Sequence, residues 1–185
     1  MTTVINFYGG PGTGKSTMAA QLFGHMKSLN MNVEYASEFA KDLTYQESKS
    51  LDDQIYVLGH QHHKIYSLFY KTDYIITDSP LLLTLYYMKD ALSKYEDKEK
   101  YNGICHSLTL LVLSLYRCHK NINYNIIRNP QKIFLQSGRN QTKEQAIAID
   151  SAINNILSKY NISHKNISSF NDVKDDLVQR NILNN

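Results

Sequence analysis

Apolar residues in this chain form short runs that alternate with longer amphipathic stretches. A short apolar run bounded by turn residues predicts a buried strand. Five such runs are present, and the last of them is the weakest. They lie at 4–8, 33–36, 74–77, 122–128 and 162–167.

Apolar residues three and four positions apart predict helices between these strands. Met18, Leu22 and Met26 share one such face directly after the first strand. Further helices are predicted at 38–43, 51–71, from 79–80, up to about 119, at 142–160 and from about 172. Ser79 and Pro80 fit the start of one helix, with Ser79 as cap and Pro80 in the first helical position. The charged stretch 94–103 is predicted to be a surface connection.

Alternating strands and helices indicate an α/β fold with a parallel sheet covered by helices on both faces. The length of 185 residues fits a single domain, residues 1–185. In such a sheet, ligands bind at the carboxyl ends of the strands. The residues that directly follow each predicted strand are therefore the first candidates for a functional site.

The stretch GGPGTGKST follows the first strand and fits the P-loop pattern G-x-x-x-x-G-K-[ST], from Gly9 to Ser16. Glycines let backbone N–H groups curl around a phosphate, and the following helix points its positive end at the same anion. The alternative is an ordinary glycine-rich turn, but strand, loop and helix coincide as the motif requires. The predicted nucleotide-binding residues are Gly10, Gly12, Thr13, Gly14, Lys15, Ser16 and Thr17.

The predicted fold is a three-layer P-loop fold of about five strands. Two residues of the loop and one residue after the third strand have specific predicted roles in it. Lys15 is expected to reach the β- and γ-phosphates of ATP, and the Ser16 hydroxyl is expected to hold Mg²⁺. Asp78 follows the third strand, where a carboxylate contacts Mg²⁺ or its water or serves as a base. The alternative for Asp78 is a helix cap. The expected cofactors are therefore ATP, or another nucleoside triphosphate, and Mg²⁺.

Other charged and polar residues are candidates for the acceptor and the transferred group. Glu38 follows the second strand and could accept a proton from an acceptor hydroxyl or hold its sugar, or simply begin a helix. Gln61 is a candidate for substrate binding through its amide, or part of a polar face. Arg128, Lys132 and Arg139 lie in or beside a lid predicted at about 129–141, which could neutralise a phosphoryl group or form a solvated surface.

Composition and charge restrict the partners and the cellular compartment that we expect for the protein. The formal net charge of +3 is mild and does not argue for nucleic acid. The two cysteines, Cys105 and Cys118, do not form a C-x-x-C pair, which fits a reduced compartment. No signal peptide is expected, and the apolar stretch 107–116 is too short to span a bilayer. We therefore expect a cytoplasmic protein with no membrane partner, in the host cytoplasm if it is viral.

Five segments together resemble the small P-loop kinase-like proteins carried by bacteriophages, a family related to nucleoside and nucleotide kinases and to the ribosylnicotinamide kinase domain. They are GGPGTGKST, VEYASEFAKDL, LGHQHHKIY, YIITDSPLLL and GRNQTKEQA. The resemblance implies a nucleotide-kinase-like fold with a lid and a phosphotransferase activity. It implies Lys15, Ser16 and Thr17 on ATP and Mg²⁺, Glu38 and Asp78 near the acceptor, and Arg128 and Arg139 in the lid.

Three functions remain open. The first is a kinase that transfers the γ-phosphate to a nucleoside, a nucleotide or a related acceptor. The second is a phage DNA kinase, since some members of the resembled family phosphorylate 5-hydroxymethyluracil in DNA. The third is an ATPase or GTPase switch without an acceptor, a class that usually needs a water-positioning Gln or Glu. DNA and a second copy of the chain, as a homodimer, remain open as partners.

Overall fold

A computed structural model of the protein describes residues 1–93, 98–131 and 141–184. Within these residues, five strands form one parallel sheet in the order β2-β3-β1-β4-β5. The strands are β1 (Thr3–Tyr8), β2 (Val33–Ala36), β3 (Tyr74–Thr77), β4 (Lys120–Ile126) and β5 (Lys165–Ile167). The predicted α/β fold with a five-stranded parallel sheet is therefore confirmed.

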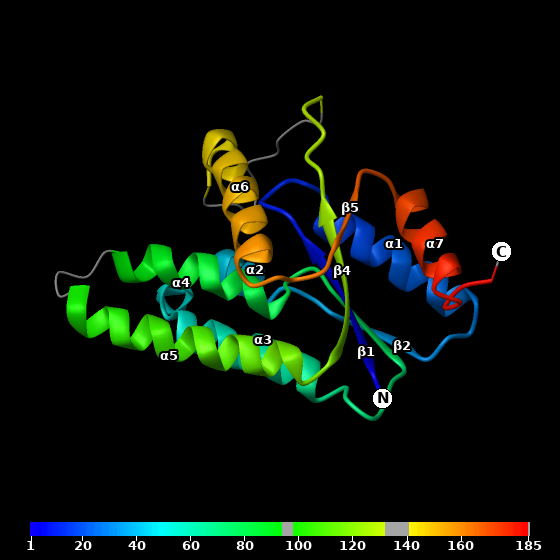
Figure 1. Cartoon of the computed structure of the whole chain (residues 1–185), viewed down its shortest axis with the longest axis horizontal. Helices are drawn as coiled ribbons and strands as arrows, with labels where there is room; N and C mark the ends of the chain where they lie inside the picture. The colour runs from blue at the N-terminus through cyan, green and yellow to red at the C-terminus, as the bar shows by residue number, and fades with distance from the viewer. Residues whose placement is uncertain (94–97, 132–140, 185) are drawn as a thin grey trace.

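Helices cover both faces of the sheet, which gives three layers (Figure 1). On one face, α1 and α7 pack against the sheet, and α3, α4, α5 and α6 lie on the other. The short helix α2 connects β2 to α3. The bounds are α1 (Lys15–Ser28), α2 (Phe39–Tyr45), α3 (Gln54–Tyr66), α4 (Thr84–Ser93), α5 (Lys98–Arg117), α6 (Lys143–Lys159) and α7 (Phe170–Gln179).

The central strand β1 explains why the core has two halves. Successive side chains of a strand point to opposite faces. Val4 and Tyr8 therefore enter the core under α3–α6, whereas Ile5 and Phe7 enter the core under α1 and α7. All six residues of β1 are buried, which is typical of the middle strand of a parallel sheet.

The register of the sheet brings the ends of its strands to one level. Asn6 of β1 pairs with Thr77 of β3 and with Asn123 of β4, and Ala36 of β2 pairs with Thr77 as well. The loops that follow β1, β2 and β3 consequently leave the sheet side by side. This edge carries the residues that the sequence singled out.

One predicted helix begins and ends elsewhere. The helix predicted at 51–71 is divided, because the Asp53 carboxylate accepts the N–H groups of Ile55 and Tyr56 at 3.1 Å each and so caps α3. A separate 3₁₀ helix, Lys49–Asp52, precedes it, and α3 ends at Tyr66.

The other two differences concern residues 79–103. Pro80 is the residue before a 3₁₀ helix, Leu81–Leu83, and not the first residue of a helix capped by Ser79. The charged connection predicted at 94–103 was also wrong in part, since α5 already begins at Lys98. Across the described ranges, no helix combines the length and the apolar character needed to cross a membrane.

Candidate active site

The P-loop follows β1 and depends on glycine for its shape. Gly9, Gly12 and Gly14 have φ angles of 137°, 79° and 109°, a region that other residues rarely adopt. Gly14 precedes α1 without a side-chain cap, so the first N–H groups of the helix are not used by a capping side chain. A helix start of this kind is a ready site for a phosphate.

Lys15 lies over the loop that it follows. Its Nζ donates to the Gly10 carbonyl at 3.2 Å, and the Thr13 hydroxyl donates to the same oxygen at 2.9 Å. Ser16 and Thr17 follow in the first turn of α1. The structure thus places the predicted P-loop residues in one loop and helix start.

The charges of the site act on each other. Burial lowers the pKa of Lys15, and the negative charges of Glu38, Asp78 and Asp150 oppose this change. Arg128 adds a smaller effect in the same direction as burial. The segments that follow β1, β2, β3 and β4, together with α6, therefore bring two cations and three carboxylates close enough to influence one another's charge.

Asp78 is the carboxylate best placed for a metal ion. Its side chain is 2% exposed, and one of its oxygens, Oδ1, is buried without a hydrogen-bond partner among the described residues. A buried carboxylate oxygen is costly without a partner, and Mg²⁺ prefers oxygen ligands. The chemistry of the Asp78 carboxylate therefore suits a Mg²⁺ ligand, and a magnesium site shared with Ser16 stays a prediction. Tyr35 of β2 lies beside Asp78, and burial followed by the charge of Asp78 raises the pKa of its hydroxyl.

Glu38 is the residue before α2 and is held on both sides by α3. The Gln61 Oε1 accepts the Phe39 N–H at 3.0 Å, while its Nε2 donates to the Thr77 hydroxyl at 3.4 Å. On the other side, Lys64 Nζ donates to the carbonyl and the hydroxyl of Ser37, both at 3.2 Å. The backbone around Glu38 is therefore fixed by a neighbouring helix.

The environment of Glu38 changes its acidity. Burial raises the pKa of Glu38, and the nearby charges of Asp78 and Asp42 raise it further. Lys15 and Lys41 act in the opposite direction. A carboxylate with a raised pKa accepts a proton more readily, which suits a general base.

Gln61 was predicted to bind the substrate, and in the structure its amide contacts neighbouring residues of the protein. It is 3% exposed, and both ends of its amide contact the protein, at Phe39 and Thr77. These contacts connect the end of β3 to the start of α2. A substrate contact of Gln61 stays a prediction.

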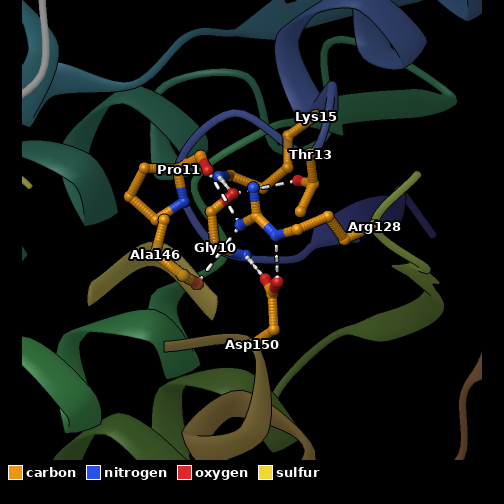
Figure 2. A network of polar contacts seen from close by, with 7 residues as sticks. All are labelled: Gly10, Pro11, Thr13, Lys15, Arg128, Ala146 and Asp150. Carbon is orange, nitrogen blue, oxygen red and sulfur yellow. Dashed lines mark hydrogen bonds and ion pairs between the residues drawn. The ribbon is translucent and has the colours of Figure 1, made fainter. Parts of the chain in front are cut away.

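Arg128 follows β4 and contacts the backbone of the P-loop, as Figure 2 shows. Its Nη2 donates to the Pro11 carbonyl at 2.9 Å, and its Nε pairs with Asp150 of α6 at 2.5 Å. The sequence prediction missed Asp150. The available signal was a carboxylate four residues after Ala146, on the same side of an amphipathic helix as buried Ile149 and Ile153.

Two predicted residues, Lys132 and Arg139, lie outside the described residues, as does most of the lid predicted at about 129–141. His60 of α3 stacks on Phe39, with 4.3 Å between the ring centroids. The described part of the chain holds no group of three His, Cys, Asp or Glu residues suited to a metal ion.

Fold and site together define a P-loop protein, and the comparison with protein families agrees. Residues 4–175 match a family described as an AAA domain, so the chain belongs to this family. No curated protein matches the sequence.

Solved structures describe the fold in more detail, as a P-loop kinase-like α/β fold. A structure of NadR protein in complex with NR aligns with a TM-score of 0.72 at 14% identity, covering 99% of this chain. The thymidylate kinase of Ehrlichia chaffeensis aligns at 0.60 with 15% identity, over 97% of this chain and 99% of its own. Deoxyadenosine kinase of M. mycoides with bound dATP aligns at 0.58 with 19% identity, over 96% and 98%.

The NadR comparison covers only part of the larger protein. This chain spans 52% of the NadR chain and almost the full length of the two kinases. At these identities the likeness establishes the fold, a P-loop kinase-like α/β domain.

Proposed function

We propose that the protein is an ATP- and Mg²⁺-dependent phosphotransferase that moves the γ-phosphate to a nucleoside, a nucleotide or a related acceptor. The observation that carries the proposal is the placement of Lys15, Asp78 and Glu38 at one edge of the sheet, where the loops after β1, β3 and β2 meet. Similar folds in kinases of thymidylate and deoxyadenosine support the same class of acceptor.

Three sets of residues are proposed to act on ATP, on the metal ion and on the transferred phosphoryl group. The P-loop N–H groups and Lys15 bind the phosphates and stabilise the charge of the transferred group. The oxygens of Ser16 and Asp78 would hold Mg²⁺, which supplies charge neutralisation at the phosphates. Lys132 and Arg139 are proposed to act on the substrate and on the transferred group.

Glu38 is proposed to serve the acceptor. When a hydroxyl is the acceptor, its oxygen forms a bond to the γ-phosphorus while the bond from that phosphorus to the β,γ-bridging oxygen breaks. ADP leaves, and the hydroxyl proton passes to the Glu38 carboxylate. The raised pKa of Glu38 favours this transfer relative to an ordinary exposed glutamate.

Incubation with γ-labelled ATP and Mg²⁺ tests this function. The acceptors to be compared are nucleosides, nucleoside monophosphates, nicotinamide riboside, and DNA with and without 5-hydroxymethyluracil. We expect label on a small nucleoside-type acceptor, and Lys15→Ala is the control for contaminating kinases. Label found only on DNA that contains the modified base would identify DNA, and not a small molecule, as the acceptor. Label released only as phosphate, at a rate independent of acceptor, would contradict the proposal and favour a hydrolase or switch.

A further inference from the structure

The carboxylate of Asp150 connects α6 to the P-loop and to Arg128, which follows β4. Its Oδ1 accepts the Gly10 N–H at 2.6 Å, and its Oδ2 accepts the Nε–H of Arg128 at 2.5 Å (Figure 2). The side chains of Arg128 and Asp150 are 15% and 20% exposed. An ion pair this well shielded is weakened less by solvent and salt than a surface pair.

The guanidinium of Arg128 contacts a second peptide of the loop, the one between Pro11 and Gly12. Its Nη2 donates to the Pro11 carbonyl at 2.9 Å and to the Ala146 carbonyl of α6 at 3.2 Å. Gly10 and Pro11 are thus held by one carboxylate and one guanidinium. We call these contacts among Gly10, Pro11, Arg128, Ala146 and Asp150 the Arg128–Asp150 network.

Gly10 shows how closely α6 approaches the loop. A Cβ atom at this position would lie 2.6 Å from the Ala146 carbonyl oxygen and 2.6 Å from Asp150 Oδ1. Real contacts of this kind do not occur without a shift of the backbone. The glycine at position 10 therefore lets the helix rest on the loop, a role separate from the positive φ angles at Gly9, Gly12 and Gly14.

We propose that Asp150 and Arg128 are positioning residues that hold the Gly9–Gly10 and Pro11–Gly12 peptides of the P-loop in the shape that binds the triphosphate. The inference rests on the proposed function, and it assigns Asp150 a role in nucleotide binding without contact to the nucleotide. In the structure Arg128 acts on the loop backbone. Its predicted action on the transferred phosphoryl group is a different role, and the two roles predict different kinetics.

The chemistry of the network explains why a carboxylate is needed. Both oxygens of Asp150 accept hydrogen bonds, one from each neighbour. An asparagine of the same size has only one such oxygen, and its NH₂ group would face either Gly10 N–H or Arg128 Nε–H. Asp150→Asn thus keeps the volume and disrupts one half of the network.

The test measures ATP affinity by calorimetry, and kcat and KM, in Asp150→Asn, Arg128→Gln and the double variant. We expect each single variant to bind ATP about tenfold more weakly, because a charge-assisted contact to the loop is lost. The double variant should be only slightly weaker than either single variant, because both changes break one network. If Asp150→Asn does not fold, Arg128→Lys takes its place with the same expected weakening, since an ammonium lacks the planar fork.

A matched control removes an ion pair far from the P-loop. Arg180 Nε pairs with Asp176 Oδ2 at 2.6 Å at the end of α7, so Arg180→Gln makes the same chemical change there. We expect normal ATP affinity in this variant, with any effect confined to thermal unfolding.

Three results would overturn the inference. Asp150→Asn could bind ATP as tightly as the wild type, or lose thermal stability alone, as in the control. Arg128→Gln could lower kcat at unchanged ATP affinity, which would make Arg128 a catalytic residue. Absence of ATP binding by the wild-type protein would instead refute the proposed function itself.

Discussion

The site has two sides that are built in different ways. The phosphate side, residues 9–17, takes its shape from its own glycines and is contacted by a charged pair, Asp150 of α6 and Arg128, which follows β4. The acceptor side, residues 37–39, contains no glycine and is held from α3 by the neutral amide of Gln61 and by Lys64. Each side thus has its own supporting helix on the same face of the sheet.

Because of this difference, substitutions on the two sides should have different effects. In the proposed function, the phosphate side presents backbone N–H groups to a highly charged ligand, so its conformation is the functional element. In the same proposal, the acceptor side presents one carboxylate, Glu38, so the backbone on either side of this residue is the functional element. Changes on the first side should therefore alter ATP binding, and changes on the second should alter transfer at unchanged ATP affinity.

The largest effect is expected for Lys15→Ala on the phosphate side. Loss of a charge-assisted contact worth about 1.5–3 kcal/mol in the transition state should lower turnover by about ten- to a hundredfold. Steady-state kinetics with ATP measures this. A folded variant with normal turnover would remove Lys15 from the mechanism.

Asp78→Asn tests the proposed Mg²⁺ site. An amide keeps the size but lacks the charge that binds Mg²⁺, so metal affinity should fall by about 10- to 100-fold. A Mg²⁺ titration of activity should then show a higher requirement for the ion. The same variant with an ordinary Mg²⁺ curve would leave Asp78 with a structural role only.

Gln61→Leu addresses the support of the acceptor side. It leaves the Phe39 N–H without its acceptor, so Glu38 should lose its position and transfer should slow by up to about tenfold. ATP affinity should not change. Gln21→Leu, on the exposed side of α1, is the control. A loss of ATP affinity equal to the loss of transfer would contradict the division between the two sides.

The smallest effect is expected in the pH profile. The raised pKa of Glu38 places the loss of transfer on acidification above the ordinary glutamate value of 4.5, because the base works only when deprotonated. Lys41 lowers this pKa through its charge. Lys41→Gln should therefore move the acidic limb of the profile to higher pH. An unmoved limb, or one moved to lower pH, would show that another group is responsible.

The sequence predicted the phosphate side more completely than the acceptor side. Gly9 to Ser16 lie in one continuous motif between a strand and a helix, so local pattern was sufficient. The partners that hold Glu38 come from α3, more than twenty residues further on, and a local pattern does not contain them. Asp150 is 140 positions from Gly10 and looked like an ordinary polar residue of an amphipathic helix.

The strands could be predicted more accurately than the ends of the helices, and the reason is physical. Buried strands give short apolar runs with turn residues at each end, and β2 and β3 begin and end where these runs predicted. Helix ends depend on single side chains. Asp53 begins α3 inside a continuous apolar pattern, whereas Thr142 and Gln145 form a capping box at the predicted start of α6.

The most direct test of this account is the ATP affinity of Glu38→Gln, measured by calorimetry with Mg²⁺ present. The substitution removes a negative charge near Lys15, so ATP should bind at least as tightly as in the wild type although transfer is lost. That result would assign Glu38 to the acceptor alone. ATP binding weakened as much as in Lys15→Ala would contradict the account, because both sides would then serve the nucleotide.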